Sequence, residues 1–243
     1  MSIELEHSHT PDAIRDRLAA GASAGYVRDW IYGAIDGAVT IFAVVAGVRG
    51  AELSTAVVLV LGLANLLADG FAMGAGNYIA TKSEWDDYRR LIEIERRHIA
   101  LAPEGEREEI RQIFARKGFA AADLERIVDV IAADETRWVE TMAIEEYGAS
   151  SVRKSPVLAG FVTFAAFILA GLMPLATYVA SGSFSVCTAV TGGVFFAIGA
   201  GRSLWSPTGW LRSGLETCAI GLSAAGLAFF VGYGMRELLV PPP

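Results

Sequence analysis

Side chains that could bind a cation stand at helical spacing inside an apolar stretch of the chain. Asn65, Asp69, Met73 and Asn77 follow one another at intervals of four, so on a helix they would form a stripe along one face. Carboxylate and amide oxygens bind hard cations, and a thioether adds a preference for softer transition metals such as Fe(II) or Co(II). The stripe therefore predicts a path for a divalent metal ion. The alternative is that Met73 fills space and the two asparagines hydrogen-bond neighbouring helices.

A second acid, Asp36, lies in another apolar stretch. Acids inside a membrane-spanning segment are costly, and each is a functional candidate. Asp69 stands beside a Gly-x-x-x-Gly pattern, which allows two helices to approach closely. Asp69 is therefore either part of an ion or proton path or a paired acid at a helix contact.

A charged segment further along the chain carries three more pairs of metal-binding side chains. They are Glu95 with His98, Glu106 with Glu109, and Met142 with Glu146. Spacings of three or four place both members of a pair on one helix face. Glu-x-x-His is also the spacing of ferritin-like di-iron bundles, which need two copies, and this segment has one. Each pair alone indicates a solvated surface, but their recurrence on successive helices supports metal binding and a solvated surface equally.

Asp36 and the stripe from Asn65 to Asn77 lie in long apolar segments, which must position their side chains. No charged residue occurs from 155 to 201, whereas residues 82–154 hold 17 of the 27 acidic and 13 of the 20 basic residues. About 20 apolar residues suffice to cross a bilayer as a helix. The sequence predicts an all-α membrane protein with five transmembrane helices, at about 30–48, 53–80, 156–180, 185–201 and 213–235. A net charge of −7 argues against nucleic-acid binding, which needs a basic face.

The charged segment itself reads as a helical insert between the second and third spans. The second span should continue as one long charged helix up to Pro103, and the next helix should run from Pro103 to Gly118, because proline and glycine mark such limits. Leu124, Ile127, Val128 and Ile131 repeat as one apolar helix face. We therefore divide the chain into an N-terminal tail (1–27), helices 1–2 (28–81), the insert (82–154) and helices 3–5 (155–243).

Basic residues predict the orientation, since they collect on the cytoplasmic side. With the N-terminus and the insert in the cytoplasm, 18 of the 20 basic residues lie inside, and the C-terminus lies outside. The first 25 residues contain no apolar signal segment. Cys187 and Cys218 should be small core residues, and His7 with His9 should belong to a mobile tail. Arginine outnumbers lysine 17 to 3, which suggests a bacterial plasma membrane.

The chain contains the motifs "YGAIDGAVTIFAVVAG" and "LADGFAMGAGNYIATKSEWD", followed by the acidic insert and three further spans. This pattern resembles the vacuolar iron transporter family over about residues 28–236. The resemblance implies a homodimeric transporter, not an enzyme, with no permanently bound cofactor. Such a transporter would move Fe(II), and also Mn(II) or Co(II), out of the cytoplasm in exchange for protons. Asp36 and Met73 would line the path at the dimer interface. The metal-binding insert would use Glu95, Glu106, Glu109, Met142 and Glu146.

The chain departs from the family pattern at three positions. Asn77 stands where many members carry the glutamate of "GEY", His98 replaces a glutamate, and Ala143 replaces a methionine. Imidazole can bind a metal as well as a carboxylate can, with more transition-metal preference and more pH sensitivity. The rival interpretation is a membrane-anchored ferritin-like di-iron enzyme, or an iron-storage or sensing module.

Overall fold

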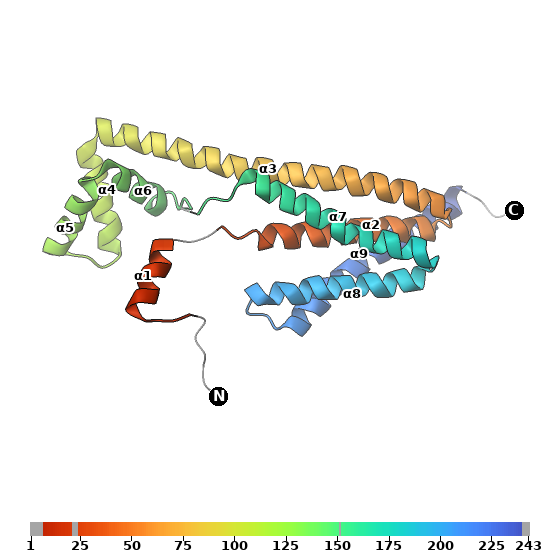
Figure 1. The fold of residues 1–243 in the computed structure, drawn as a ribbon. Helices are drawn as coiled ribbons and strands as arrows, with labels where there is room; N and C mark the ends of the chain where they lie inside the picture. Colours follow the sequence, from red (N-terminus) through yellow and green to blue (C-terminus); the bar gives the residue numbers. More distant parts are fainter. Residues whose placement is uncertain (1–6, 21–23, 151, 240–243) are drawn as a thin grey trace. The chain divides into compact units, whose positions relative to one another are not determined.

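The structure, a computed structural model, describes residues 7–20, 24–150 and 152–239, and all regular structure in these ranges is helical (Figure 1). The helices, in chain order, are α1 (Pro11–Ala20), α2 (Val27–Gly50), α3 (Thr55–Leu101), α4 (Pro103–Arg116), α5 (Ala121–Ala132), α6 (Glu135–Glu145), α7 (Pro156–Ser181), α8 (Phe184–Arg202), the short 3-10 helix η1 (Ser203–Trp205) and α9 (Trp210–Leu239). The all-α prediction is confirmed.

The chain divides into two compact units. We call Met1–Ala24 with Thr81–Lys154 the charged unit, and Gly25–Ala80 with Ser155–Pro243 the apolar unit. Helix α3 is 47 residues long and contributes its first part to the apolar unit and its second part to the charged unit. Its continuity agrees with the predicted extension of the second span up to Pro103.

Five helices of the described chain are long and apolar enough to cross a membrane: α2, α3, α7, α8 with η1, and α9. At a rise of about 1.5 Å per residue, the 24 residues of α2 extend over about 36 Å. A bilayer core is about 30 Å thick. Length and composition therefore fit a membrane protein.

Within the apolar unit, α2 packs against α7, α8 and α9, around the fully buried rings of Phe42, Phe167 and Phe195. Glycine permits close contact between these helices: a Cβ placed at Gly37 would lie 2.2 Å from the carbonyl oxygen of Phe167. Cys187 is buried in the same core, and its thiol donates to the carbonyl oxygen of Pro174 at 3.3 Å. The predicted packing role of Cys187 is therefore confirmed.

Helix α3 meets α7 through a pair of glycines, one on each helix. A Cβ at Gly160 would lie 2.6 Å from the carbonyl oxygen of Gly74, and a Cβ at Gly74 would lie 2.9 Å from that of Gly160. Because backbone atoms cannot move aside as a flexible side chain can, this crossing needs glycine on both helices. The Gly-x-x-x-Gly pattern beside Asp69 thus does serve helix contact.

The charged unit has an apolar core of its own. Ile110, Val128, Ile131, Trp138 and Met142 form this buried cluster, so the apolar face predicted on the 124–131 helix does pack inward. The Asp134 side chain accepts the backbone N–H of Arg137 at 2.8 Å and caps α6, a favourable N-terminal arrangement. On the surface, Arg111 pairs with Glu108 of α4 and with Glu125 of α5.

Candidate metal centre

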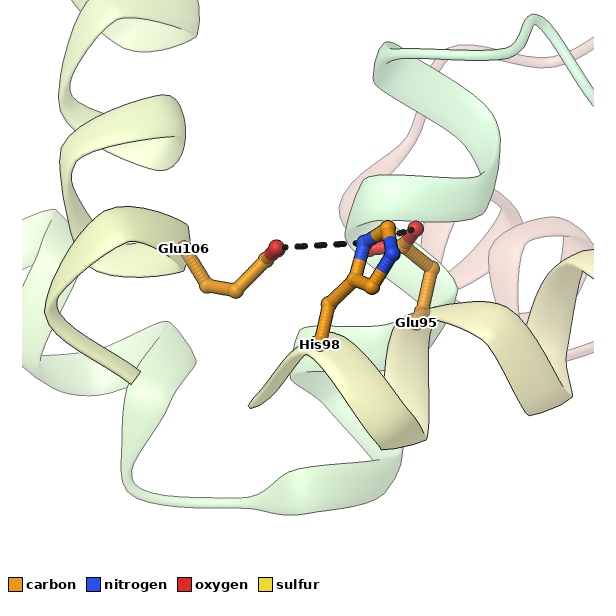
Figure 2. A group of neighbouring side chains, drawn as sticks. All are labelled: Glu95, His98 and Glu106. Carbon is orange, nitrogen blue, oxygen red and sulfur yellow. Dashed lines mark ion pairs between the residues drawn. The ribbon is translucent and has the colours of Figure 1, made fainter. Parts of the chain in front are cut away.

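The turn between α3 and α4 brings three potential metal ligands together. Glu95 and His98 lie in the last turns of α3, and Glu106 lies in the first turn of α4, just after the proline that starts the helix. One ligand atom from each residue lies within 4.8 Å of the others. Figure 2 shows the three side chains pointing toward one another from the two helices. The imidazole Nδ1 of His98 is 3.7 Å from Oε1 of Glu95 and 3.4 Å from Oε1 of Glu106.

The two carboxylates of this cluster are buried, while the imidazole remains partly open. Glu95 is 0% exposed and Glu106 is 5% exposed, whereas 45% of the His98 side chain is exposed. The second oxygens of both glutamates, Oε2, have no hydrogen-bond partner in the described chain. A buried carboxylate without compensation is costly, and a bound cation would supply that compensation. The imidazole gives such an ion a side that solvent reaches.

The charges around Glu106 also favour a bound cation at this cluster. Burial, followed by the charges of Glu109, Glu95 and Glu146, raises the pKa of Glu106 to about 7. Burial, followed by Glu109, also raises the pKa of Glu146. Close carboxylates raise one another's pKa because like charges disfavour ionisation. Glu109 and Glu146 therefore contribute to the field of the cluster, and a divalent ion would relieve the repulsion.

Met142 has a different place from the other predicted ligands. It is fully buried and belongs to the apolar core of the charged unit. The structure therefore brings Glu95, His98 and Glu106 into one group, adds Glu109 and Glu146 through their charges, and puts Met142 in the adjoining core.

Tyr147, which sequence reasoning missed, also contacts the cluster. Its hydroxyl donates to Oε1 of Glu95 at 3.1 Å. Burial, followed by the neighbouring Glu95, raises the pKa of Tyr147 above its ordinary value, so the phenol keeps its proton at neutral pH. A contact between residues 52 positions apart leaves no periodic signal in the sequence.

In the apolar unit, the residues predicted for a path lie on α2 and α3. Asp36 and Asp69 are both exposed in this single chain, and the two carboxylates interact electrostatically. Met73 is half-buried and packs against the apolar core. The structure thus brings an acid of α2 and an acid of α3, both on apolar helices, near one another.

Asn77 instead forms part of a polar bridge between helices. Its amide donates to Oδ1 of Asp29 at 3.0 Å, to the carbonyl oxygen of Ala159 at 3.2 Å and to the hydroxyl of Thr163 at 2.7 Å. Asp29 is 7% exposed and Thr163 is 0% exposed. The bridge joins α2, α3 and α7. Asp29 was not among the predicted candidates.

Comparison with known proteins gives a family and several relatives. A sequence profile of the VIT family matches residues 27–233. "Vacuolar iron transporter 1" of Arabidopsis thaliana is 32% identical over 215 residues, which cover 84% of this chain and 83% of that protein. "Vacuolar iron transporter" of Toxoplasma gondii is 38% identical over 148 residues, 60% of this chain and 49% of that protein. "Vacuolar iron transporter 2" of Oryza sativa is 34% identical over 141 residues, 57% of each. The chain thus matches about half of the Toxoplasma and rice proteins, and all three names are those of transporters.

Proposed function

Because the chain belongs to the VIT family, we propose that it moves divalent transition-metal ions, above all Fe(II), out of the cytoplasm in exchange for protons. The observation that carries this proposal is the group formed by Glu95, His98 and Glu106, with two buried carboxylate oxygens that have no partner among the described residues. The printed names of the relatives supply iron as the cargo of those proteins.

Capture of the ion would take place in the charged unit. Two carboxylates and one imidazole suit Fe(II), Mn(II) or Co(II), and the imidazole disfavours Mg(II) and Ca(II), which prefer oxygen ligands alone. Glu106, with a pKa of about 7, must give up a proton when the ion binds, because a metal coordinates the deprotonated carboxylate. Binding should therefore weaken as the pH falls below 7.

Passage through the membrane would use the two acids of the apolar unit and Met73. Asp36 and Asp69 are exposed on the surface of this single chain, and uncovered acids in hydrocarbon are costly. A second copy of the chain facing this surface would cover them, and the path would then run between the two copies. Asp36 would alternate between holding a proton and holding the ion, with Met73 favouring the softer metals.

The orientation follows from the basic residues, 18 of which lie on the proposed cytoplasmic side. The five apolar helices would all cross the membrane, with the charged unit inside. The names of the relatives point to the vacuole of two plants and a protozoan, and give no support to the bacterial plasma membrane suggested by the arginine content.

The rival interpretation, a ferritin-like di-iron enzyme or storage module, has weaker support. The described residues hold one group of three candidate ligands, where a ferritin-like site needs two Glu-x-x-His motifs. The relatives carry the names of transporters.

Flux into proteoliposomes tests the proposal. With an imposed proton gradient, the unaltered protein should move Fe(II) and Co(II), and Asp36→Asn should abolish the flux, because it keeps the shape of the side chain and removes its charge. Met73→Ala should reduce Fe(II) and Co(II) flux more than Mn(II) flux, and Asp69→Asn should have the mildest effect. Asp87→Asn is the matched control, because Asp87 pairs with Arg90 on the surface of α3. Gradient-independent flux, or unchanged flux from Asp36→Asn protein, would contradict the mechanism.

A further inference from the structure

The hydrogen bond between Tyr147 and Glu95 leaves one carboxylate oxygen available. Oε1 of Glu95 accepts the phenol hydrogen at 3.1 Å, whereas Oε2 has no partner among the described residues. Glu95 is fully buried, so neither oxygen can turn toward bulk water. Oε1 therefore lies between the phenol and Nδ1 of His98, which is 3.7 Å away, while Oε2 accepts no hydrogen bond from the described residues.

Tyr147 is held in place by contacts that do not involve the cluster. It follows the last turn of α6, where the backbone N–H of Gly148 donates to the carbonyl oxygen of Ile144 and that of Ala149 donates to the carbonyl oxygen of Ala143, both at 3.0 Å. Gly148 has φ +68°, the left-handed conformation that commonly ends a helix. The backbone position of Tyr147 is therefore set by this helix end.

The segment that follows Tyr147 contacts α3, the helix that carries Glu95. The guanidinium of Arg153 lies 4.5 Å from the ring centre of Tyr88 and 5.5 Å from that of Trp85. The indole N–H of Trp85 donates to the carbonyl oxygen of Lys154 at 2.8 Å. Tyr147 is thus anchored through its neighbours on both sides.

We propose that Tyr147 is a positioning residue, which holds Oε1 of Glu95 beside His98 and so leaves Oε2 to bind the metal ion together with His98 and Glu106. This inference rests on the proposed capture site and adds a residue that the ligand set alone does not contain. Groups that orient a metal ligand from behind typically change metal affinity by about 10–100-fold when removed. Tyr147 acts through Glu95 and does not itself touch the ion.

The test uses the full-length protein in detergent with Co(II) as the probe, followed by its visible absorption and by competition with a chelating dye. Tyr147→Phe removes one hydroxyl and should weaken Co(II) binding about 10-fold, with unchanged stoichiometry and an altered absorption band. Tyr88→Phe is the matched control, because its ring, which contacts Arg153, is retained. Tyr88→Phe should bind as the unaltered protein does.

Two outcomes separate the inference from the function it rests on. Unchanged affinity and an unchanged band in Tyr147→Phe would overturn the positioning role while leaving the capture site intact. Unchanged Co(II) binding in Glu95→Gln would overturn the capture site itself. If Tyr147→Phe fails to fold, infrared difference spectra of the unaltered protein against Glu95→Gln decide. Coordination through one oxygen should widen the separation of the two carboxylate stretches of Glu95, and a separation typical of two-oxygen coordination would overturn the inference.

Discussion

Replacing Glu106 by glutamine should stabilise the metal-free charged unit at alkaline pH. Burial and the neighbouring acids raise the pKa of Glu106 from its ordinary 4.5 to about 7. Each pH unit of such a displacement is worth about 1.4 kcal/mol, so ionised Glu106 destabilises the folded unit by about 3 kcal/mol above pH 7. Glutamine has nearly the same shape and cannot ionise, and it should therefore remove that destabilisation.

The sign of the pH dependence follows from proton binding. Between pH 4.5 and 7 the folded protein holds a proton on Glu106 that the unfolded chain does not hold. The stability that this proton contributes is complete below pH 4.5 and is lost as the pH rises through 7. The unaltered protein and Glu106→Gln should therefore be equally stable near pH 4.5 and should diverge up to pH 8.

The stabilities of Glu106→Gln and the unaltered protein are compared at each pH by amide hydrogen exchange of α4 and α6. The exchange is measured by mass spectrometry in the presence of a chelator. At pH 8 the variant should be protected up to about 100-fold more strongly, the equivalent of about 3 kcal/mol. Glu108→Gln is the matched control on the same helix: hydrogen bonds from Gln112 and Arg111 lower the pKa of Glu108, so its replacement should reduce protection at pH 8. Equal protection of Glu106→Gln and the unaltered protein at pH 8 would refute the reasoning.

Two further predictions concern the apolar unit and its topology. Gly160→Ala should destabilise the α3–α7 contact by about 1–3 kcal/mol, because the new Cβ would meet the carbonyl oxygen of Gly74 at 2.6 Å. Thermal unfolding in detergent measures the loss of stability. Gly193→Ala is the control, because Gly193 faces open space. In intact cells, a membrane-impermeant thiol reagent should label a cysteine placed at position 243, which lies beyond the described residues. It should not label a cysteine placed at Arg107. The reverse pattern of labelling would contradict the five-span topology.

The long elements could be predicted because each depends on local sequence. The first span was expected at 30–48 and the helix covers Val27–Gly50. The turn at Pro103 was expected from the proline itself, and it separates α3 from α4. The family was likewise predictable from the two apolar motifs, and the profile match over residues 27–233 confirms it.

The site could be predicted only as far as helix periodicity reaches. Glu95 and His98 share a helix face by spacing alone, but their approach to Glu106 depends on the angle between α3 and α4, which no local pattern encodes. Tyr147 reaches Glu95, and Asn77 reaches Asp29 and Thr163, across long sequence separations. Such contacts follow from tertiary packing, and a single sequence carries no periodic sign of them.

The Asn77 bridge sets an uncharged group opposite the carboxyl group of Asp29. An amide carries no charge at any physiological pH, so the two hydrogens that Asn77 shares among Asp29, Ala159 and Thr163 are present at every such pH. A glutamate at this position would set a second carboxyl group against Asp29 and would make the α2–α3–α7 joint depend on a shared proton. With asparagine there, Asp29 is the one carboxyl group in this bridge, and the three helices are joined without a proton shared between two acids.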